Sequence, residues 1–334
     1  MLGVVFSILS AATFALNATA ARRAVLSGTV VQGLMVTVPI GVPLFAALVV
    51  AVGEWRLLGA FPLEAYAWFA AAGIVHFVIG RYGNYASSGA IGTNLAAPIL
   101  QAEVIITLVL AMVLLGESLT PLRALGIALI MIGPGLISGR DDGKKTGVET
   151  AEPPADDRAA SKPAFRPRYA EGYAFATLAA VAYGCSPICI GMGLKAAGGV
   201  GVIAGGLVSY VAATLAVGLI LLAMPASTFR LTRSALGWFS FAGLFVFLSQ
   251  AFRYAAMGLA PVSVVTALQR LSSLFRIYFG WVMNRDHEVF DPSVLVATVV
   301  SMAGAIALSV STELFLSLAD WPEWLVGLAR MKWP

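Results

Sequence analysis

Long apolar segments, bounded by charged residues, glycine or proline, recur along the whole chain. A helix that crosses the hydrocarbon core of a bilayer needs about 20 apolar residues. Segments of that kind cover residues 2–20, 29–52, 66–86, 91–115 and 120–138 in the first half, and 171–194, 199–224, 235–257, 261–283 and 291–312 in the second half. The pattern predicts an all-α membrane protein with about ten transmembrane helices.

Two polar segments interrupt this pattern. Residues 139–170 carry seven Lys or Arg, six Asp or Glu and four prolines, with few apolar residues. A segment of that composition buries too little apolar surface to fold, so we predict a flexible linker. Residues 313–334 interleave tryptophan with Arg330 and Lys332, which is typical of an amphipathic tail at the membrane surface.

The two halves repeat each other. Arg81-Tyr82 returns as Arg253-Tyr254, 172 residues later, and Glu117 to Pro121 returns as Glu288 to Pro292, 171 residues later. We therefore predict one five-helix repeat in residues 1–138 and a second in residues 171–312. Because five is odd, the second repeat enters the bilayer from the opposite side, and two inverted repeats are typical of secondary transporters.

Composition supports a membrane protein and excludes several other classes. Hydrophobic residues make up 59% and charged residues 11% of the chain, against about 25% charged in soluble domains, and the mean hydropathy is +0.88. The net charge of +4 is dispersed and does not indicate nucleic-acid binding. We expect the lipid bilayer and a small-molecule substrate as partners, and no nucleic acid.

The sequence contains no signature of a cofactor or metal site. It has no phosphate-binding glycine-rich loop, so ATP hydrolysis by this chain is not expected. His76 and His287 lie far apart in sequence, and Cys185 and Cys189 lie one helical turn apart, where packing is the expected role. We predict no cofactor and no metal.

Polar residues in the fourth and ninth spans are the candidates for substrate binding. In the ninth span they recur at intervals of three and four residues and so share one helical stripe. The fourth span carries a shorter stripe around Pro98, and the repeat makes the two spans equivalent. The predicted substrate-binding residues are Asn94, Gln101, Thr266, Gln269, Arg270 and Ser273. Such stripes line a wet cavity or join helices by hydrogen bonds, and we favour the cavity.

Ionisable residues inside spans are the candidates for proton coupling or gating, because charge in the membrane is costly. They are Glu103, His76 and Arg276. Glu103 needs a partner, and Arg270 or Arg276 is the natural one; a purely structural ion pair is the alternative. We interpret Arg81 and Arg253 as helix-end charges that reach headgroups or tie helices together. The excess of arginine favours a carboxylate- or phosphate-bearing substrate.

Several short segments resemble one transporter family. They are Phe14-Ala15-Leu16-Asn17, Arg81 to Ala86, Asn94 with Pro98, Leu115 to Thr120, Tyr183-Gly184 with Pro187, and Ala260-Pro261. With them the chain resembles the EamA-type group of the drug/metabolite transporter superfamily. The resemblance implies ten helices in two five-helix repeats, a location in the cell inner membrane and no enzymatic activity. Arg270 departs from the pattern, since it stands where the first half has Pro98.

The leading interpretation is a secondary transporter that exports a small polar, zwitterionic or anionic metabolite by alternating access. A multidrug or lipophilic-cation exporter is the first alternative. An integral membrane enzyme acting on lipid is the second, with Asp286-His287-Glu288 as its only dense titratable group. The sequence leaves assembly as a homodimer open.

Orientation is also left open, because two signals disagree. The family arrangement places both termini in the cytoplasm. That arrangement leaves five Lys or Arg on the inner side and twelve on the outer side, counted over the loops. The positive-inside rule therefore favours the reverse orientation, with an internal linker.

Overall fold

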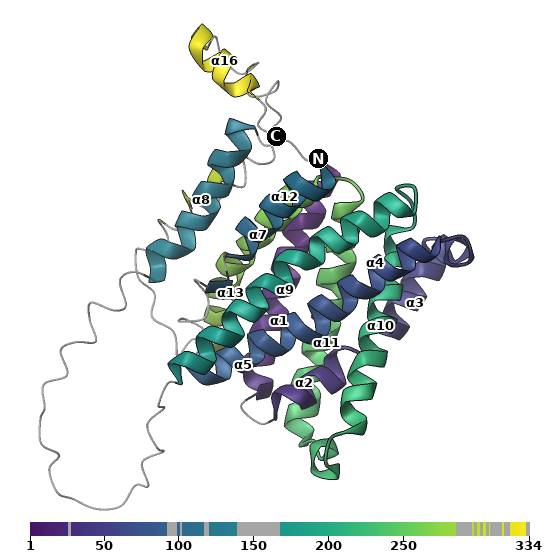
Figure 1. Ribbon diagram of the computed structural model, residues 1–334. Coiled ribbons are helices and arrows are strands. Elements are labelled where there is room, and N and C mark those ends of the chain that lie inside the picture. The colour runs from purple at the N-terminus through teal and green to yellow at the C-terminus, as the bar shows by residue number, and fades with distance from the viewer. Residues whose placement is uncertain are drawn as a thin grey trace, which may run out of the picture.

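The computed structural model describes residues 1–25, 28–91, 99–100, 102–116, 120–138, 168–284 and 321–331, together with a few isolated positions between 296 and 316. Every regular element in these ranges is a helix, and most of these helices pack into one bundle (Figure 1). The predicted all-α membrane protein is confirmed.

The first half consists of helices that pass up and down the bundle. They are α1 (Leu2–Val25), α2 (Val30–Thr37), α3 (Gly41–Ala51), the short η1 (Glu54–Gly59), α4 (Leu63–Gly73), the π-helix η2 (Ile74–Gly80), α5 (Arg81–Ile91), α7 (Glu103–Leu110), the π-helix η3 (Ala111–Leu115) and α8 (Pro121–Ser138). Continuous helical segments join α4, η2 and α5, and α7 and η3.

The second half follows the same plan. Its elements are α9 (Tyr169–Ala196), α10 (Val202–Leu222), the short η5 (Ala226–Phe229), α11 (Arg233–Met257), α12 (Val262–Leu268), the single 3-10 turn η6 (Gln269–Leu271) and α13 (Ser272–Asn284). The C-terminal helix α16 (Glu323–Arg330) lies against α8.

Six of the described helical segments are long and apolar enough to cross a membrane. They are Leu2–Ala21, Val30–Ala51, Leu63–Ser87, Tyr169–Ala196, Val202–Leu222 and Arg233–Met257. The segment Glu103–Leu115 is apolar but shorter. The predicted span 291–312 lies almost entirely outside the described residues, as does the predicted linker up to residue 167, so the count of ten stays a prediction.

Local sequence signals explain several helix ends. Thr29 caps α2, and Gln32 completes the capping box by accepting from the Thr29 amide at 2.9 Å. Thr120 caps α8 by accepting from the Arg123 amide at 3.3 Å, and Pro121 takes the first helical position. The break between α2 and α3 falls at residues 38–40, around Pro39.

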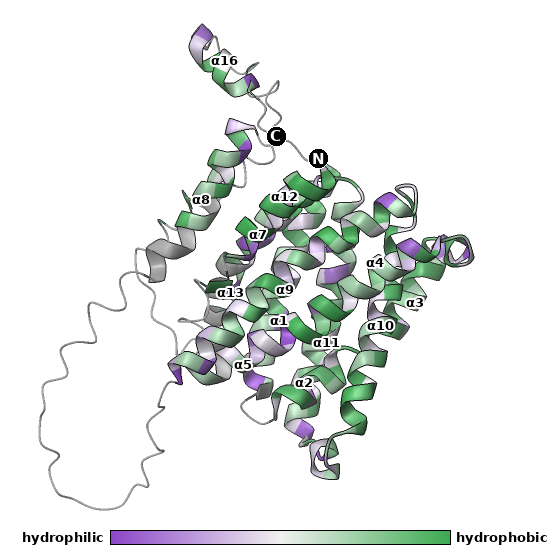
Figure 2. Ribbon diagram, viewed as in Figure 1, coloured by the Kyte–Doolittle hydropathy of each residue, from purple (hydrophilic) through white to green (hydrophobic). Residues whose placement is uncertain are grey.

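Apolar side chains cover the outside of the bundle. On α10, for example, Val211, Leu215, Leu219 and Leu222 are exposed at intervals of three and four residues, so they form one outward stripe. Figure 2 shows hydrophobic residues along the long helices, with fewer hydrophilic ones, some of them at the helix ends and some within the bundle. In water such a surface would drive association, whereas in a bilayer it faces lipid.

Small residues allow the helices to pack closely. A Cβ atom on Gly73 would lie 2.0 Å from the backbone oxygen of Ser209, so α4 and α10 are in backbone contact at this point. Near that contact, the Phe45 ring lies 5.0 Å from Tyr210 and 5.1 Å from Phe247. Close approach at small residues and aromatic filling elsewhere are how membrane helices associate without a hydrophobic driving force.

The two ends of the bundle can be assigned by neighbouring elements. The start of α1 lies at the same end as α16, and a Cβ on Gly3 would lie 3.0 Å from the Ala260 side chain between α11 and α12 (Figure 1). At the opposite end the Arg168 amide, at the start of α9, donates to the carbonyl of Ala90 in α5 at 3.0 Å. We call these ends the terminal end and the linker end.

Candidate functional site

Among the described residues, four side chains of the Asp, Glu, His, Lys and Arg types lie buried inside the bundle, at positions where the surrounding helices are apolar. They are His76, Arg81, Glu103 and Arg253, each less than a tenth exposed. They come from both halves of the chain, on η2, α5, α7 and α11. Burial of charge in a membrane is costly and is kept where it serves a function, so these residues define the candidate site.

His76 lies at the centre of a hydrogen-bonded cluster. Its Nδ1 lies 3.0 Å from Nη1 of Arg253, and its Nε2 lies 3.1 Å from the side-chain amide of Gln250. Arg253 also donates to the Gln250 oxygen at 3.5 Å. Since a guanidinium can only donate, Nδ1 of His76 accepts from Arg253; the imidazole is then neutral and carries its one hydrogen on Nε2, on the side of the Gln250 amide. We call His76, Gln250 and Arg253 the His76 cluster.

A π-helix brings Arg81 close to this cluster. The amide of Arg81 donates to the carbonyl of His76, five residues earlier, which places the two residues one above the other on the helix. In a regular α-helix residues five apart point about 140° away from each other. Arg81 donates to the Thr37 hydroxyl at 3.0 Å, and its guanidinium carbon lies 5.1 Å from the Phe77 ring centre.

A second charged group joins α7 to the 3-10 turn η6. Nη2 of Arg270 donates to Oε1 of Glu103, and the two side chains are 12% and 8% exposed. This is one of the two pairings that the sequence predicts for Glu103. Arg276, the other predicted partner, instead lies over the Phe14 ring at 5.3 Å.

The remaining predicted binding residues are only partly placed. Thr266 is buried on α12, and its hydroxyl has no hydrogen-bond partner among the described residues. Gln269 donates to the Ser10 hydroxyl on α1 at 2.7 Å, which is a contact between helices. Ser273 lies on α13, but its side chain is outside the described part of the structure, and Asn94 and Gln101 are outside it altogether. The role of these residues in substrate binding stays a prediction.

The proposed stripe of the ninth span is interrupted. Because η6 is a 3-10 turn between α12 and α13, residues on its two sides are not related by one regular α-helical period. The polar residues of the ninth span, which were placed on one face by assuming 3.6 residues per turn, therefore do not follow one continuous face of a regular α-helix. The physical cause is a local change in hydrogen bonding at the positions where Gln269 and Arg270 make their contacts.

Sequence reasoning missed Gln250 and Thr37 as residues of the site. Tyr183, which the sequence analysis names for its resemblance to the family, has its ring 4.8 Å from the His76 ring. One signal was available, since Gln250 precedes Arg253 by three residues and so shares a helical face with it. The contact between Thr37 and Arg81 has no sequence signal, because it depends on how α2 packs against α5.

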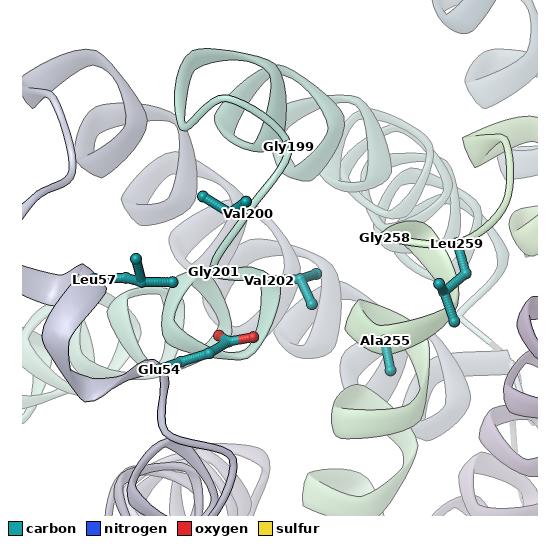
Figure 3. A pocket seen from close by; sticks show the side chains of 9 residues that line it. All are labelled: Glu54, Leu57, Gly199, Val200, Gly201, Val202, Ala255, Gly258 and Leu259. Carbon is teal, nitrogen blue, oxygen red and sulfur yellow. The ribbon is translucent and has the colours of Figure 1, made fainter.

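A shallow pocket lies apart from these buried groups, at the terminal end of the bundle (Figure 3). Its volume is about 410 Å³, and its lining includes Glu54, the glycine-rich turn at Gly199 to Gly201, and Leu259. Glu54 accepts from the Ala204 amide at 2.7 Å, in the first turn of α10. The carboxylate thus satisfies a free amide of a helix start and has a structural role.

The described residues contain no cluster of His, Cys, Asp or Glu that could hold a metal ion. Cys185 and Cys189 are free thiols on α9. The Asp286-His287-Glu288 segment, on which the enzyme alternative depends, lies outside the described residues.

Comparison with known proteins agrees with the resemblance seen in the sequence. Residues 1–139 match the EamA-like transporter family. No curated protein sequence matches the chain. A solved structure, described only as "Crystal structure of protein", has a TM-score of 0.65 and 15% identity and covers 91% of this chain and 95% of its own. At that identity the likeness shows the fold alone.

The family match covers the first five predicted spans, and the structural match extends over nearly the whole chain. Together with the apolar, lipid-facing helices they identify a multi-pass membrane protein. Residues 1–139 are thus similar to the EamA-like transporter family, and this similarity supports a membrane transporter of the drug/metabolite type.

Proposed function

We propose that this protein is a secondary transporter in the cell inner membrane that exports a small polar, zwitterionic or anionic metabolite by alternating access. The observation that carries the proposal is the buried polar group at the interface of the two halves. The His76 cluster joins η2 to α11, and the Glu103–Arg270 pair joins α7 to η6. A lipophilic cargo would need no such set of buried charges, whereas a polar cargo needs partners for its own polar atoms.

We also propose that the halves are inverted repeats. Helix α1 packs against α11 and α13, and α9, which begins the second half, packs against α4, α5 and α7. Under the predicted repeat, α9 corresponds to α1, α4 and α5 to α11, and α7 to α12 and α13. The two halves thus exchange partners reciprocally, as expected for related bundles of opposite orientation around a membrane midplane.

The Glu103–Arg270 pair is suited to act as a gate. It connects a helix of the first half to a helix break of the second half, so rocking one half against the other would separate the charges. In the low dielectric of the bundle interior, a separated pair needs new partners. The polar groups of a substrate, or a proton on Glu103, would supply them. We propose that the gate works together with the predicted substrate-binding residues. These are Asn94, Gln101, Thr266, Gln269, Arg270 and Ser273.

An untargeted comparison of metabolites tests the function. Cells that overproduce the wild-type protein are compared with cells that produce Glu103→Gln at the same membrane level, so that the burden of overproduction is matched. Export predicts that at least one polar metabolite falls inside the wild-type cells and rises in their medium. The candidate is then tested for uptake into liposomes that contain the purified protein.

Two results would contradict the proposal. The first is equal levels of all polar metabolites in cells with the wild-type and the variant protein. The second is a change confined to lipids or lipophilic cations, which would favour one of the alternatives.

A further inference from the structure

We propose that Arg253 and Arg81 form a recognition site for an oxyanion, with His76 holding Arg253 in position. The ligand is the carboxylate or phosphate group of a small metabolite. This inference rests on the proposed transport function and specifies the substrate class. It also moves the recognition site from Arg270, where the sequence placed it, to arginines that the sequence assigned to the scaffold.

The first argument is the balance of charge. Among the described residues Glu103 is the sole Asp or Glu with a buried side chain, and it is bound to Arg270. Arg81 and Arg253 are 3% and 2% exposed, and neither has a carboxylate partner in the described part of the chain. A buried charge that lacks a counter-ion is strongly unfavourable, so the bundle is suited to receive an anion.

The second argument is the kind of contact that the two arginines make. Arg81 donates to a hydroxyl, and Arg253 donates to an imidazole and an amide. All three acceptors are neutral, so they orient the guanidinium groups without compensating their charge. Arg253 also keeps its Nε free of any hydrogen-bond partner among the described residues, which leaves a donor for an oxyanion.

The third argument is that the chain departs from regular geometry to bring these groups together. The π-helix η2 aligns His76 with Arg81 on one face, and Arg253 reaches the same histidine from α11. The matched helix of the second half, α11, contains no such turn, and Leu248 stands at the position that corresponds to His76. Isolated π-turns in helices occur frequently at functional sites.

The role of His76 follows from its hydrogen bonds. As a neutral acceptor it fixes one Nη of Arg253, which leaves the remaining edge of the guanidinium available for a forked pair of bonds to an oxyanion. The aromatic rings of Tyr183 and Phe77 lie 4.8 Å and 5.0 Å from the imidazole and help to exclude water. His76 is therefore a positioning residue for Arg253.

Binding to the purified, detergent-solubilised full chain tests the site without any need for transport. Thermal unfolding is followed at constant ionic strength in sodium chloride, with sodium succinate or sodium phosphate added as the two oxyanion probes and choline chloride as the cationic control. We expect at least one oxyanion to raise the apparent Tm by about 3 °C at ten times its Kd, and choline to have no effect.

Variants assign the effect to the site. Arg253→Gln should raise the Kd at least about 30-fold. Arg253→Lys should bind weakly as well, because it keeps the charge but loses the fork. His76→Gln, which retains an acceptor, should bind better than His76→Leu. Arg56→Gln removes an exposed arginine at the terminal end and should leave binding unchanged.

Two results would overturn the site: no stabilisation by either oxyanion, or equal stabilisation of the wild type and Arg253→Lys. Arg253→Lys keeps the buried charge, so it serves where Arg253→Gln does not fold. Failure here is distinguishable from failure of the proposed function. A protein that transports a neutral or cationic metabolite but binds no oxyanion refutes this site alone, whereas one that binds oxyanions but moves no metabolite refutes the transport proposal alone.

Discussion

At the scale of single residues, the Glu103–Arg270 pair allows a direct measurement of coupling inside the bundle. Removing either charge leaves the other buried without its partner, which costs about 3–5 kcal/mol in comparable pairs. Removing both costs less than the sum of the two single losses. We therefore expect a double-mutant cycle of Glu103→Gln and Arg270→Gln, measured by unfolding in detergent, to give a coupling free energy above about 1 kcal/mol.

A second ion pair in the same chain is the matched control. Arg168 and Glu171 lie 3.2 Å apart at the linker end, with side chains 66% and 42% exposed. Solvent screens such a pair, so its coupling should stay below about 0.5 kcal/mol. Equal coupling in the two cycles would mean that Glu103 and Arg270 are hydrated, and the gate would then have no energetic basis.

The sequence predicts which side chains pair only where few partners are possible. Glu103 is the one carboxylate in its apolar surroundings, so its pairing with an arginine of the ninth span followed from the cost of burial. His76 had many conceivable neighbours. Its contacts with Gln250 and Arg253 depend on how η2 packs against α11, which periodicity does not encode.

At the scale of helices, the close contact of α4 with α10 gives a sharp prediction for glycine. Gly73→Ala would place a methyl group 2.0 Å from the Ser209 backbone oxygen, and backbone cannot move aside cheaply. We expect a loss of stability of at least about 2 kcal/mol, measured by thermal unfolding in detergent, because over-packing forces helices apart.

Gly218→Ala is the control for helix propensity. Gly218 lies on α10, and a Cβ there would meet no atom within 4 Å. Alanine is favoured over glycine in a helix by up to about 1 kcal/mol, so this variant should be unchanged or slightly more stable. A loss at both positions would show that helix flexibility, and not the close approach, explains the effect at Gly73.

Helix boundaries could be predicted closely, whereas irregular turns could not. The expected spans 171–194 and 235–257 agree with α9 and α11 within a few residues, because charge and glycine mark their ends. The π-helices η2 and η3 and the 3-10 turn η6 were not predicted. In segments that are apolar all round, no polar stripe reveals a change of period, so an assumed spacing of 3.6 residues goes untested.

At the scale of the whole molecule, the described helices determine which loops share a side of the membrane. α1 begins at the terminal end, where α16 also lies, and α8 ends and α9 begins at the linker end (Figure 1). The sequence could not decide which end faces the cytoplasm, because the family arrangement and the positive-inside rule disagree.

Single cysteines labelled from one side of the membrane test this arrangement. Cys185 and Cys189 are first replaced by alanine, and new cysteines are then placed at Trp55, which belongs to the terminal end, and at Ser227, in the loop between α10 and α11 that belongs to the linker end. Both positions lie in short 3-10 segments with no buried residues, so a membrane-impermeant maleimide can reach them.

In intact spheroplasts we expect one of the two cysteines to react and the other to react only after lysis. Reaction of both or of neither before lysis would contradict the predicted passage of α3, α4, α10 and α11 across the bilayer. The reacting position also decides the orientation: labelling at Ser227 supports cytoplasmic termini, and labelling at Trp55 supports a cytoplasmic linker, as the twelve basic residues at that end favour.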